Sequence, residues 1–146
     1  MARLFVGVMT GTSIDGLDAA LVEVEGSGVE GMSARVVRGV SLELGELQKP
    51  LRALADQTPM TAGEIAETCR GFSLLHAEAI KKVAGGDGAA VEAACVHGQT
   101  VYHKPPVSWQ LISAPLVAHA CGVPVVADLR GGPGDGRAGC AVDAAE

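Results

Sequence analysis

The segment that most constrains the fold is a short polar stretch between two apolar runs near the amino terminus. Residues 9–18 read Met-Thr-Gly-Thr-Ser-Ile-Asp-Gly-Leu-Asp, and apolar runs at 4–8 and 19–24 flank them. Two strand-like runs joined by a short Gly, Asp and Ser segment predict a β-hairpin. Gly11 and Gly16 tolerate backbone angles that other residues resist, so the turn can curl tightly.

The same turn carries groups that can bind a phosphate and a cation. Thr10, Thr12 and Ser13 place three hydroxyls within four positions, and a curled turn directs backbone N–H groups toward one point, which suits a phosphate. Asp15 and Asp18 add carboxylates, and Mg²⁺ prefers such oxygen ligands beside phosphates. A polar hairpin turn without a ligand is an equally simple interpretation, because glycine-rich loops are weak signals.

The rest of the chain alternates between strand and helix patterns, which predicts an α/β fold. Thr61 and Glu64 form a capping-box pattern at the start of the longest expected helix. His76 lies on that helix and is expected on the surface or partly packed. The expected strands are 4–9, 17–25, 34–44, 90–96 and 123–127, and the expected helices are 46–55, 62–84 and 114–121.

Polar side chains follow two of the expected buried strands. His97, Gln99 and Thr100 follow the strand that ends at residue 96, and Asp128 follows the strand that ends at residue 127. Open α/β sheets bind ligands outside the carboxyl ends of parallel strands. His97 can hydrogen-bond or move a proton near neutral pH, and Gln99 and Thr100 offer the donors and acceptors that a sugar needs. The alternatives are a histidine that only fixes its loop and a carboxylate that only caps a turn.

Composition narrows the classes of function. A net charge of −6 argues against a general nucleic-acid binder, and four scattered cysteines without a Cys-x-x-Cys pair argue against a zinc site. No apolar run reaches the ~18 residues of a membrane span, and nothing resembles a signal peptide. We therefore expect a cytoplasmic protein. The single tryptophan, Trp109, is expected to anchor a loop by packing rather than to stack on a sugar.

Three segments resemble the anhydro-N-acetylmuramic acid kinases. Residues 7–22 match the opening signature of that family, Gly-x-Met-Ser-Gly-Thr-Ser-x-Asp-Gly-x-Asp, with Thr10 in place of Ser. Residues 97–111 resemble its His-Gly-Gln-Thr block, and residues 122–130 resemble its Gly-Ile-Pro-Val-Val-x-Asp-Phe-Arg block. The three segments occur in family order, and the likeness runs over residues 4–130.

The resemblance implies an actin/hexokinase-like ATPase fold of two ribonuclease-H-like halves with ATP between them, of which this chain resembles the amino-terminal half. It implies ATP-dependent cleavage and phosphorylation of 1,6-anhydro-N-acetylmuramic acid to N-acetylmuramic acid 6-phosphate, a step of cell-wall recycling. The residues that it assigns are Gly11, Thr12, Ser13, Ile14, Asp15, Gly16, Leu17 and Asp18 to ATP, Asp15 and Asp18 to Mg²⁺, His97, Gln99 and Thr100 to the sugar, and Asp128 to catalysis.

The pattern changes after Arg130. Pro133 occupies the position where the family has its expected general base, an aspartate. Residues 131–146 lack apolar periodicity, so we expect a kinase subdomain at 1–130 and a disordered tail at 131–146. The codons allowed for this tail, read one nucleotide later, permit the family's Gly-Gly-Gln-Gly-Ala-Pro-Leu block. We therefore interpret the tail as out of frame, which the nucleotide sequence around codon 130 can test.

Other classes of function stay open at this point. The chain could be a non-catalytic module that binds nucleotide or sugar, or a fragment that needs a second polypeptide with the missing carboxyl-terminal half. A homodimer is a further alternative. The isolated chain is expected to be inactive as a kinase.

Overall fold

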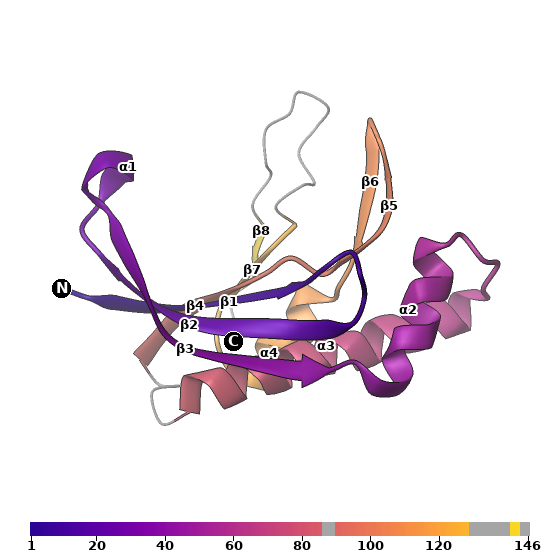
Figure 1. Ribbon diagram of the computed structural model, residues 1–146, viewed down its shortest axis with the longest axis horizontal. Coiled ribbons are helices and arrows are strands. Elements are labelled where there is room, and N and C mark those ends of the chain that lie inside the picture. The colour runs from indigo at the N-terminus through magenta and orange to yellow at the C-terminus, as the bar shows by residue number, and fades with distance from the viewer. Residues whose placement is uncertain (86–89, 129–140, 144–146) are drawn as a thin grey trace.

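A six-stranded sheet in the order β3-β2-β1-β4-β7-β8 forms the centre of the computed structural model (Figure 1). The structure describes residues 1–85, 90–128 and 141–143. The strands of this sheet are β1 (Arg3–Thr10), β2 (Gly16–Glu25), β3 (Ser33–Glu43), β4 (Val91–Val96), β7 (Val125–Ala127) and β8 (Ala141–Asp143).

The first three strands form an antiparallel meander, which begins with the predicted hairpin. β1 and β2 pair from Arg3 opposite Val24 to Thr10 opposite Leu17, so residues 11–15 make the turn. β2 pairs with β3, and one turn of helix, α1 (Gly28–Gly31), lies between them. β1, β4 and β7 are mutually parallel in neighbouring positions. The predicted α/β class is therefore confirmed.

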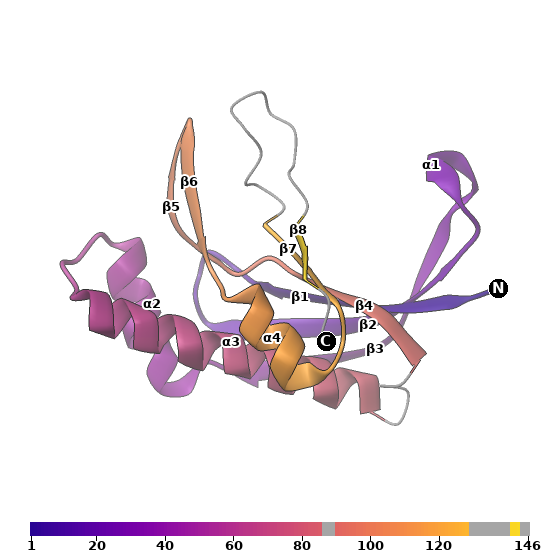
Figure 2. The same ribbon diagram turned by 180° about the vertical axis from the view of Figure 1, so that it is seen from behind.

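Two helices pack on one face of this sheet, and a third lies near the β1–β2 turn (Figures 1 and 2). These are α3 (Ala62–Ala84) and α4 (Ala114–Cys121) on the face, and α2 (Gln48–Ala55), which follows a 3₁₀ turn at Gly45–Leu47. The predicted capping box is present at the start of α3: the Thr61 N–H donates to Glu64 Oε2 at 2.7 Å, and Thr61 Oγ1 accepts from the Glu64 N–H at 3.2 Å. The Thr61 N–H and the Thr61 hydroxyl both donate to the Glu64 carboxylate, and these two bonds lower the pKa of Glu64.

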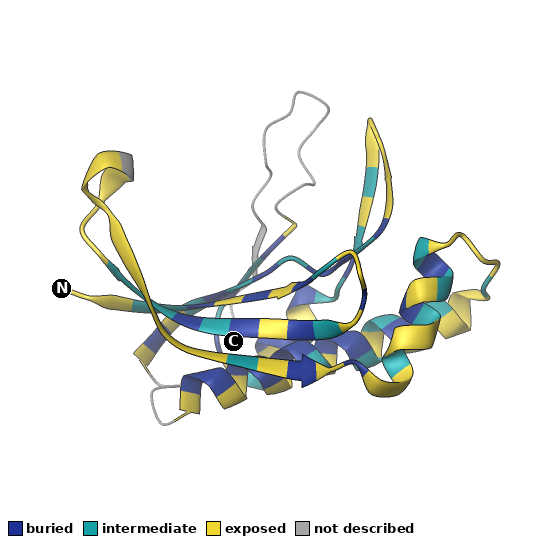
Figure 3. Ribbon diagram, in the orientation of Figure 1, coloured by how far each residue is buried: buried dark blue, intermediate teal, exposed yellow. Residues whose placement is uncertain are grey.

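The hydrophobic core lies between the sheet and the two helices (Figure 3). Alternate residues of β1 and β2 point into it, and α3 supplies Phe72, the largest fully buried side chain in the described part of the chain. The ring of Phe72 meets the ring of His76 edge to face, with 4.4 Å between centroids. Fully buried members of this core include Val6, Leu17, Leu21, Phe72, Ile80, Val83, Val96 and Val117.

The expectation that His76 lies at the surface or is only partly packed is wrong, because its side chain is completely buried. His76 Nδ1 lies 2.9 Å from the carbonyl oxygen of Phe72, which only accepts, so Nδ1 carries the proton. Burial lowers the pKa of His76 to about 4, because charging the ring in the core is unfavourable. The burial of His76 depends on which face of α3 packs on the sheet. The residues around His76 in the sequence do not show which face that is.

The opposite face of the sheet carries no helix from the described part of the chain (Figures 1 and 2). A hollow of about 400 Å³ lies there, lined by Gly7, Met9, Ala20 and Cys95 among others. A Cβ added at Gly7 would meet no atom within 4 Å. The side chains that line this bare face are mostly apolar and small.

The sequence analysis missed a second, two-stranded sheet. β5 (Gln99–Lys104) and β6 (Val107–Leu111) form a hairpin that projects away from the side on which α3 lies (Figure 1). Trp109 belongs to β6 and is 45% exposed, so the expectation of a packed loop anchor is wrong. Val, Tyr and Trp on either side of the Pro105-Pro106 pair were a strand signal, but the prolines suggested only a stiff connection.

The tail contributes one described element. Residues 141–143 form β8, which pairs antiparallel with β7. Residues 129–140 and 144–146, which include Arg130 and Pro133, lie outside the described residues. The division into a subdomain at 1–130 and a disordered tail at 131–146 therefore stays a prediction.

Candidate functional site

The turn between β1 and β2 is anchored in the core and exposed at its tip. The Ile14 N–H donates to the carbonyl of Gly11 at 3.1 Å, which closes the turn. Ile14 adopts φ of 51° and is only 2% exposed, so its side chain fixes the turn to the core. Thr12 and Ser13 are exposed, whereas the hydroxyl of Thr10 is buried below them. The tip thus presents two of the three predicted hydroxyls.

Two side chains of α2 hold this turn from one side. Gln48 Nε2 donates to the Ile14 carbonyl at 2.8 Å, and Arg52 Nη2 donates to the Ser13 carbonyl at 2.5 Å. Neither residue was singled out by the sequence analysis. They lie 34 and 39 positions from their partners, and only the fold brings them together.

The two predicted cation ligands are exposed carboxylates, and each accepts a hydroxyl hydrogen bond. Ser13 Oγ donates to Asp15 at 2.9 Å, and Ser41 Oγ of β3 donates to Asp18 at 2.5 Å. An ionised carboxylate has about four acceptor positions, so one hydroxyl bond leaves capacity for a cation. Within the described residues no three His, Cys, Asp or Glu side chains form a metal-binding cluster. Each carboxylate is of the kind that Mg²⁺ takes as a ligand, since this ion commonly takes one or two carboxylates and keeps several waters.

The remaining predicted ATP residues contribute through their backbone. The side chains of Ile14 and Leu17 are buried in the core and cannot contact a ligand at the tip. Gly11 and Gly16 are half-buried at the two ends of the turn. A Cβ at Gly11 would lie 3.3 Å from Ser13 Oγ, which is a tight contact. A larger side chain at position 11 would therefore crowd the Ser13 side chain at the tip of the turn.

His97 stands at the carboxyl end of β4, as predicted. Its N–H donates to the carbonyl of Val8 at 3.3 Å, and its Nδ1 lies 3.1 Å from the carbonyl oxygen of Gly98. Gly98 has φ of 73°, and a Cβ there would lie 3.0 Å from the Leu111 carbonyl oxygen. His97 lines the hollow on the bare face together with Asp18. His97 therefore lies at the same end of the sheet as the β1–β2 turn.

The structure separates the next two predicted sugar residues. Gln99 is only 2% exposed, so its side chain is not presented to a ligand at the surface. Its Nε2 donates to the Thr100 carbonyl at 3.2 Å, and its buried Oε1 has no hydrogen-bond partner in the described part of the chain. Thr100 is half-buried and donates from Oγ1 to Gln110 Oε1 at 2.6 Å. Gln110 was not assigned a role from the sequence.

Asp128 stands at the carboxyl end of β7 in a backbone conformation that is unusual for a non-glycine residue, with φ of 56°. It lines a hollow of about 530 Å³ between β6, the start of α4 and the end of β7. Gln110 and Ser113 line the same hollow, so a carboxylate, an amide and a hydroxyl converge there. His97 is not among the residues that line it. The two strand-end residues therefore face different hollows.

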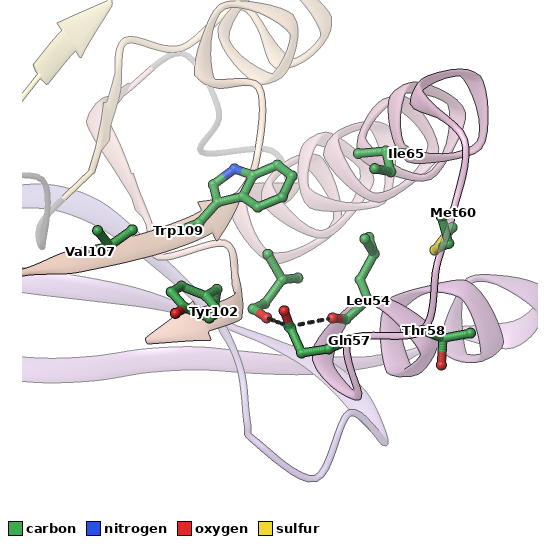
Figure 4. Close-up of a pocket in the computed structure, with 9 residues that line it drawn as sticks. Leu54, Gln57, Thr58, Met60, Ile65, Tyr102, Val107 and Trp109 are labelled. Atoms are coloured by element: carbon green, nitrogen blue, oxygen red, sulfur yellow. Dashed lines mark hydrogen bonds between the residues drawn. The ribbon is translucent and has the colours of Figure 1, made fainter. Parts of the chain in front are cut away.

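A third hollow, of about 390 Å³, lies between the β5–β6 hairpin and the α2–α3 connection (Figure 4). Gln57 links the two sides of this hollow, because its Nε2 donates to the carbonyl of Leu54 in α2 and to that of Val101 in β5, both at 2.9 Å. Met60, Ile65, Tyr102 and Trp109 are among its other lining residues, and no acidic or basic side chain lines it. None of the predicted site residues belongs to this hollow.

No helix in the described part of the chain is long and apolar enough to cross a bilayer. The cysteines there, Cys69, Cys95 and Cys121, are half-buried. Burial raises the pKa of the Cys69 and Cys121 thiols.

Comparison with known proteins identifies the relatives of this chain. The family model described as anhydro-N-acetylmuramic acid kinase matches residues 3–135. The anhydro-N-acetylmuramic acid kinase of Gluconobacter oxydans is 37% identical over 132 residues, which cover 86% of this chain and 36% of that protein. The Bordetella pertussis enzyme of the same name is 38% identical over 137 residues, which cover 88% of this chain and 34% of that protein.

Among solved structures, Thermus thermophilus RuvC in complex with a Holliday junction substrate matches with a TM-score of 0.39 and 20% identity, over 87% of this chain and 65% of that chain. That likeness is too low for any conclusion about this chain. This chain spans about a third of the length of its curated relatives. Because the family model covers most of its residues, the chain belongs to the anhydro-N-acetylmuramic acid kinase family.

Proposed function

We propose that this chain is the ATP-binding, amino-terminal part of a kinase that opens and phosphorylates 1,6-anhydro-N-acetylmuramic acid to give N-acetylmuramic acid 6-phosphate. The observation that carries the proposal is the β1–β2 turn. Its residues match the family signature, and it is curled, glycine-bounded and exposed at Thr12 and Ser13. Membership of a kinase family supports ATP as the co-substrate.

The fold assignment is part of the same proposal. We assign the chain to the ribonuclease-H-like half of an actin/hexokinase-like ATPase. Support comes from the antiparallel meander at one side of the sheet and the parallel β1, β4 and β7 at its centre, with α3 and α4 in the connections. The sheet order and the one-sided helices agree with such a half.

In this proposal the turn acts by positioning charge, which is the main task of a protein in phosphoryl transfer. Backbone N–H groups and the hydroxyls of Thr12 and Ser13 bind the terminal phosphates. Asp15 and Asp18 hold Mg²⁺, partly through water, and this ion neutralises charge on the phosphates when it is bound. His97 and Asp18 line the same hollow on the bare face.

The sugar side is proposed around the ends of β4 and β7. His97 supplies polar groups at the end of β4, and Asp128 supplies them at the end of β7 together with Gln110 and its partner Thr100. Gln99 does not contact the sugar in this proposal. Its amide is buried and donates to the Thr100 carbonyl, so its role is to hold the backbone of this segment. A cytoplasmic location belongs to the same proposal, because the reaction consumes ATP.

We also propose that residues 1–146 alone do not complete the reaction. Pro133 stands where the family's general base is expected, and it has no ionisable group. The chain spans only about a third of its relatives' length, so the groups that enclose ATP in those proteins belong largely to the remainder. The nucleotide-binding step and the chemical step can therefore be tested separately.

The nucleotide role of the turn is tested by Gly11→Val. The added side chain would crowd Ser13 and block close approach to the backbone. We expect calorimetry or NMR titration of the 146-residue chain with Mg²⁺-ATP to show weak binding that Gly11→Val reduces at least tenfold. Gly31→Val is the matched control, because a Cβ at Gly31 meets nothing within 4 Å. Equal ATP affinity of the wild type and Gly11→Val would reject the proposed role.

A further inference from the structure

We propose that Gln48 and Arg52 of α2 form a clamp that sets the conformation of the β1–β2 turn, and that Arg52 also supplies the positive charge that lets this turn bind a polyphosphate. The second part rests on the proposed function of the turn. Neither residue belongs to the family signature segments that the sequence analysis identified. The ligand class is an inorganic or nucleoside polyphosphate.

The geometry of the clamp is specific to the turn. Gln48 and Arg52 are four residues apart on α2, so their side chains share one face of the helix. They donate to two successive carbonyls, Arg52 to Ser13 and Gln48 to Ile14. In a trans peptide the N–H points opposite to the C=O. Because the carbonyls of Ser13 and Ile14 point toward α2, the N–H groups in the same two peptide units point away from α2.

Those N–H groups belong to Ile14 and Asp15. The Ile14 N–H closes the turn on the Gly11 carbonyl at 3.1 Å. The Asp15 N–H is attached to the peptide unit whose carbonyl Gln48 holds, so it points away from Gln48. The Ile14 N–H is used within the turn, so the peptide unit that the clamp prepares for a phosphate is the one that carries the Asp15 N–H.

Ile14 explains why a clamp is needed. Its φ of 51° lies in the left-handed region, which is unfavourable for a β-branched residue. Such strain persists only where the surroundings hold the backbone in place. The buried side chain of Ile14 and the bond from Gln48 to its carbonyl both do so. Without them we expect the turn to relax toward ordinary backbone angles.

Charge gives Arg52 its second role. The turn carries Asp15 and Asp18, and the chain as a whole has a net charge of −6, so a polyphosphate would meet repulsion. Arg52 is exposed and donates directly to Ser13, the residue whose hydroxyl donates to Asp15. The guanidinium lies on the α2 side of the turn, whereas the Asp15 N–H points to the other side, so Arg52 acts on a bound polyphosphate through its positive charge rather than through a hydrogen bond.

The test uses the ¹⁵N-labelled 146-residue chain, with sodium tripolyphosphate and Mg²⁺-ATP as probes and amide shifts of residues 11–15 as the readout. Arg52→Ala should weaken both interactions about fivefold or more, because it removes a positive charge beside the turn. Arg52→Lys keeps the charge and should recover most of the affinity. Arg70→Ala, which removes an exposed arginine from α3, is the matched control and should change affinity less than twofold.

Hydrogen exchange of the Ile14 amide without any anion tests the clamp separately. Exchange should be at least tenfold faster in both Gln48→Ala and Arg52→Ala, and unchanged in Arg70→Ala. Unchanged exchange in the two α2 variants would overturn the clamp. Equal losses of anion affinity in Arg52→Ala and Arg70→Ala would overturn the local charge role. If the wild-type turn shows no shifts with either anion, the proposed function and the charge role of Arg52 both fail, while the exchange result still decides the clamp.

Discussion

The two faces of the central sheet differ sharply, although the same strands supply both. Toward α3 and α4, Val6 and Leu17 are fully buried against side chains such as Phe72. On the other face, Gly7 and Ala20 line an open hollow of about 400 Å³. Because successive residues of a strand point to opposite faces, one apolar run serves both.

The difference between the two faces is reflected in the order of apolar and polar residues along the strands. A sheet with one face in water alternates apolar and polar residues, whereas parallel strands buried on both faces read as continuous apolar runs. β1 and β4 follow the second pattern, with Gly7, Met9 and Cys95 on the uncovered side. The central strands are therefore suited to a second cover, and the described residues supply only the first.

The largest expected effect concerns the covered face. Phe72→Ala should lower the free energy of unfolding by about 3–5 kcal/mol, because it removes a fully buried ring and leaves a cavity against His76. Urea denaturation followed by circular dichroism measures this change. Leu74→Ala on the same helix is the control: Leu74 is 36% exposed, so we expect a loss below about 1 kcal/mol. Similar losses at both positions would show that the covered face is not closely packed.

The second effect concerns the buried histidine on the same face. The pKa of His76 falls from 6.5 to about 4 on folding, so between these values the unfolded chain binds a proton that the folded chain does not. Stability should therefore fall as the pH falls through this window, by about 2 kcal/mol at pH 5. Denaturation curves at pH 7 and pH 5 measure the difference. His76→Gln should lose this part of the pH dependence, and an equally steep acid loss in that variant would contradict the assignment.

The smallest effect on stability concerns the bare face. Ala20→Lys adds a charge over the open hollow beside Gly7, where space is available, so the free energy of unfolding should change by less than about 0.5 kcal/mol. An exposed apolar face favours association, so sedimentation velocity should show less self-association in this variant than in the wild type. Leu74→Lys on the outside of α3 is the control. Equal effects of the two lysines on association would remove the bare face as its cause.

Local signals predicted the fold well where they were complete. The Thr61 capping box and the αL residue Gly122, with φ of 71°, mark helix ends that sequence alone could place. The β5–β6 hairpin was missed because two prolines at its turn resembled a rigid linker. The burial of His76 was missed because the orientation of α3 depends on contacts that are distant in sequence.

The candidate site also has one part that the sequence predicts and another part that only the structure shows. The turn at residues 11–18 was visible because all of its chemistry lies in one short segment. Its partners Gln48 and Arg52 were not visible, because their bonds reach across more than 30 residues. The residue type of Gln99 suggests that it could bind a ligand, because its amide offers donors and acceptors. Only the structure shows that this amide is buried and not exposed to a ligand.

The central claim is that this chain carries the ATP-binding turn of a kinase but does not by itself complete phosphoryl transfer. The most direct measurement incubates the purified 146-residue chain with 1,6-anhydro-N-acetylmuramic acid, ATP and Mg²⁺ and follows N-acetylmuramic acid 6-phosphate by mass spectrometry. We predict no product above the protein-free background, because Pro133 replaces the expected base and a positioned base contributes about 10²–10⁴-fold. Sustained product formation that scales with protein concentration and disappears in Gly11→Val would contradict the account.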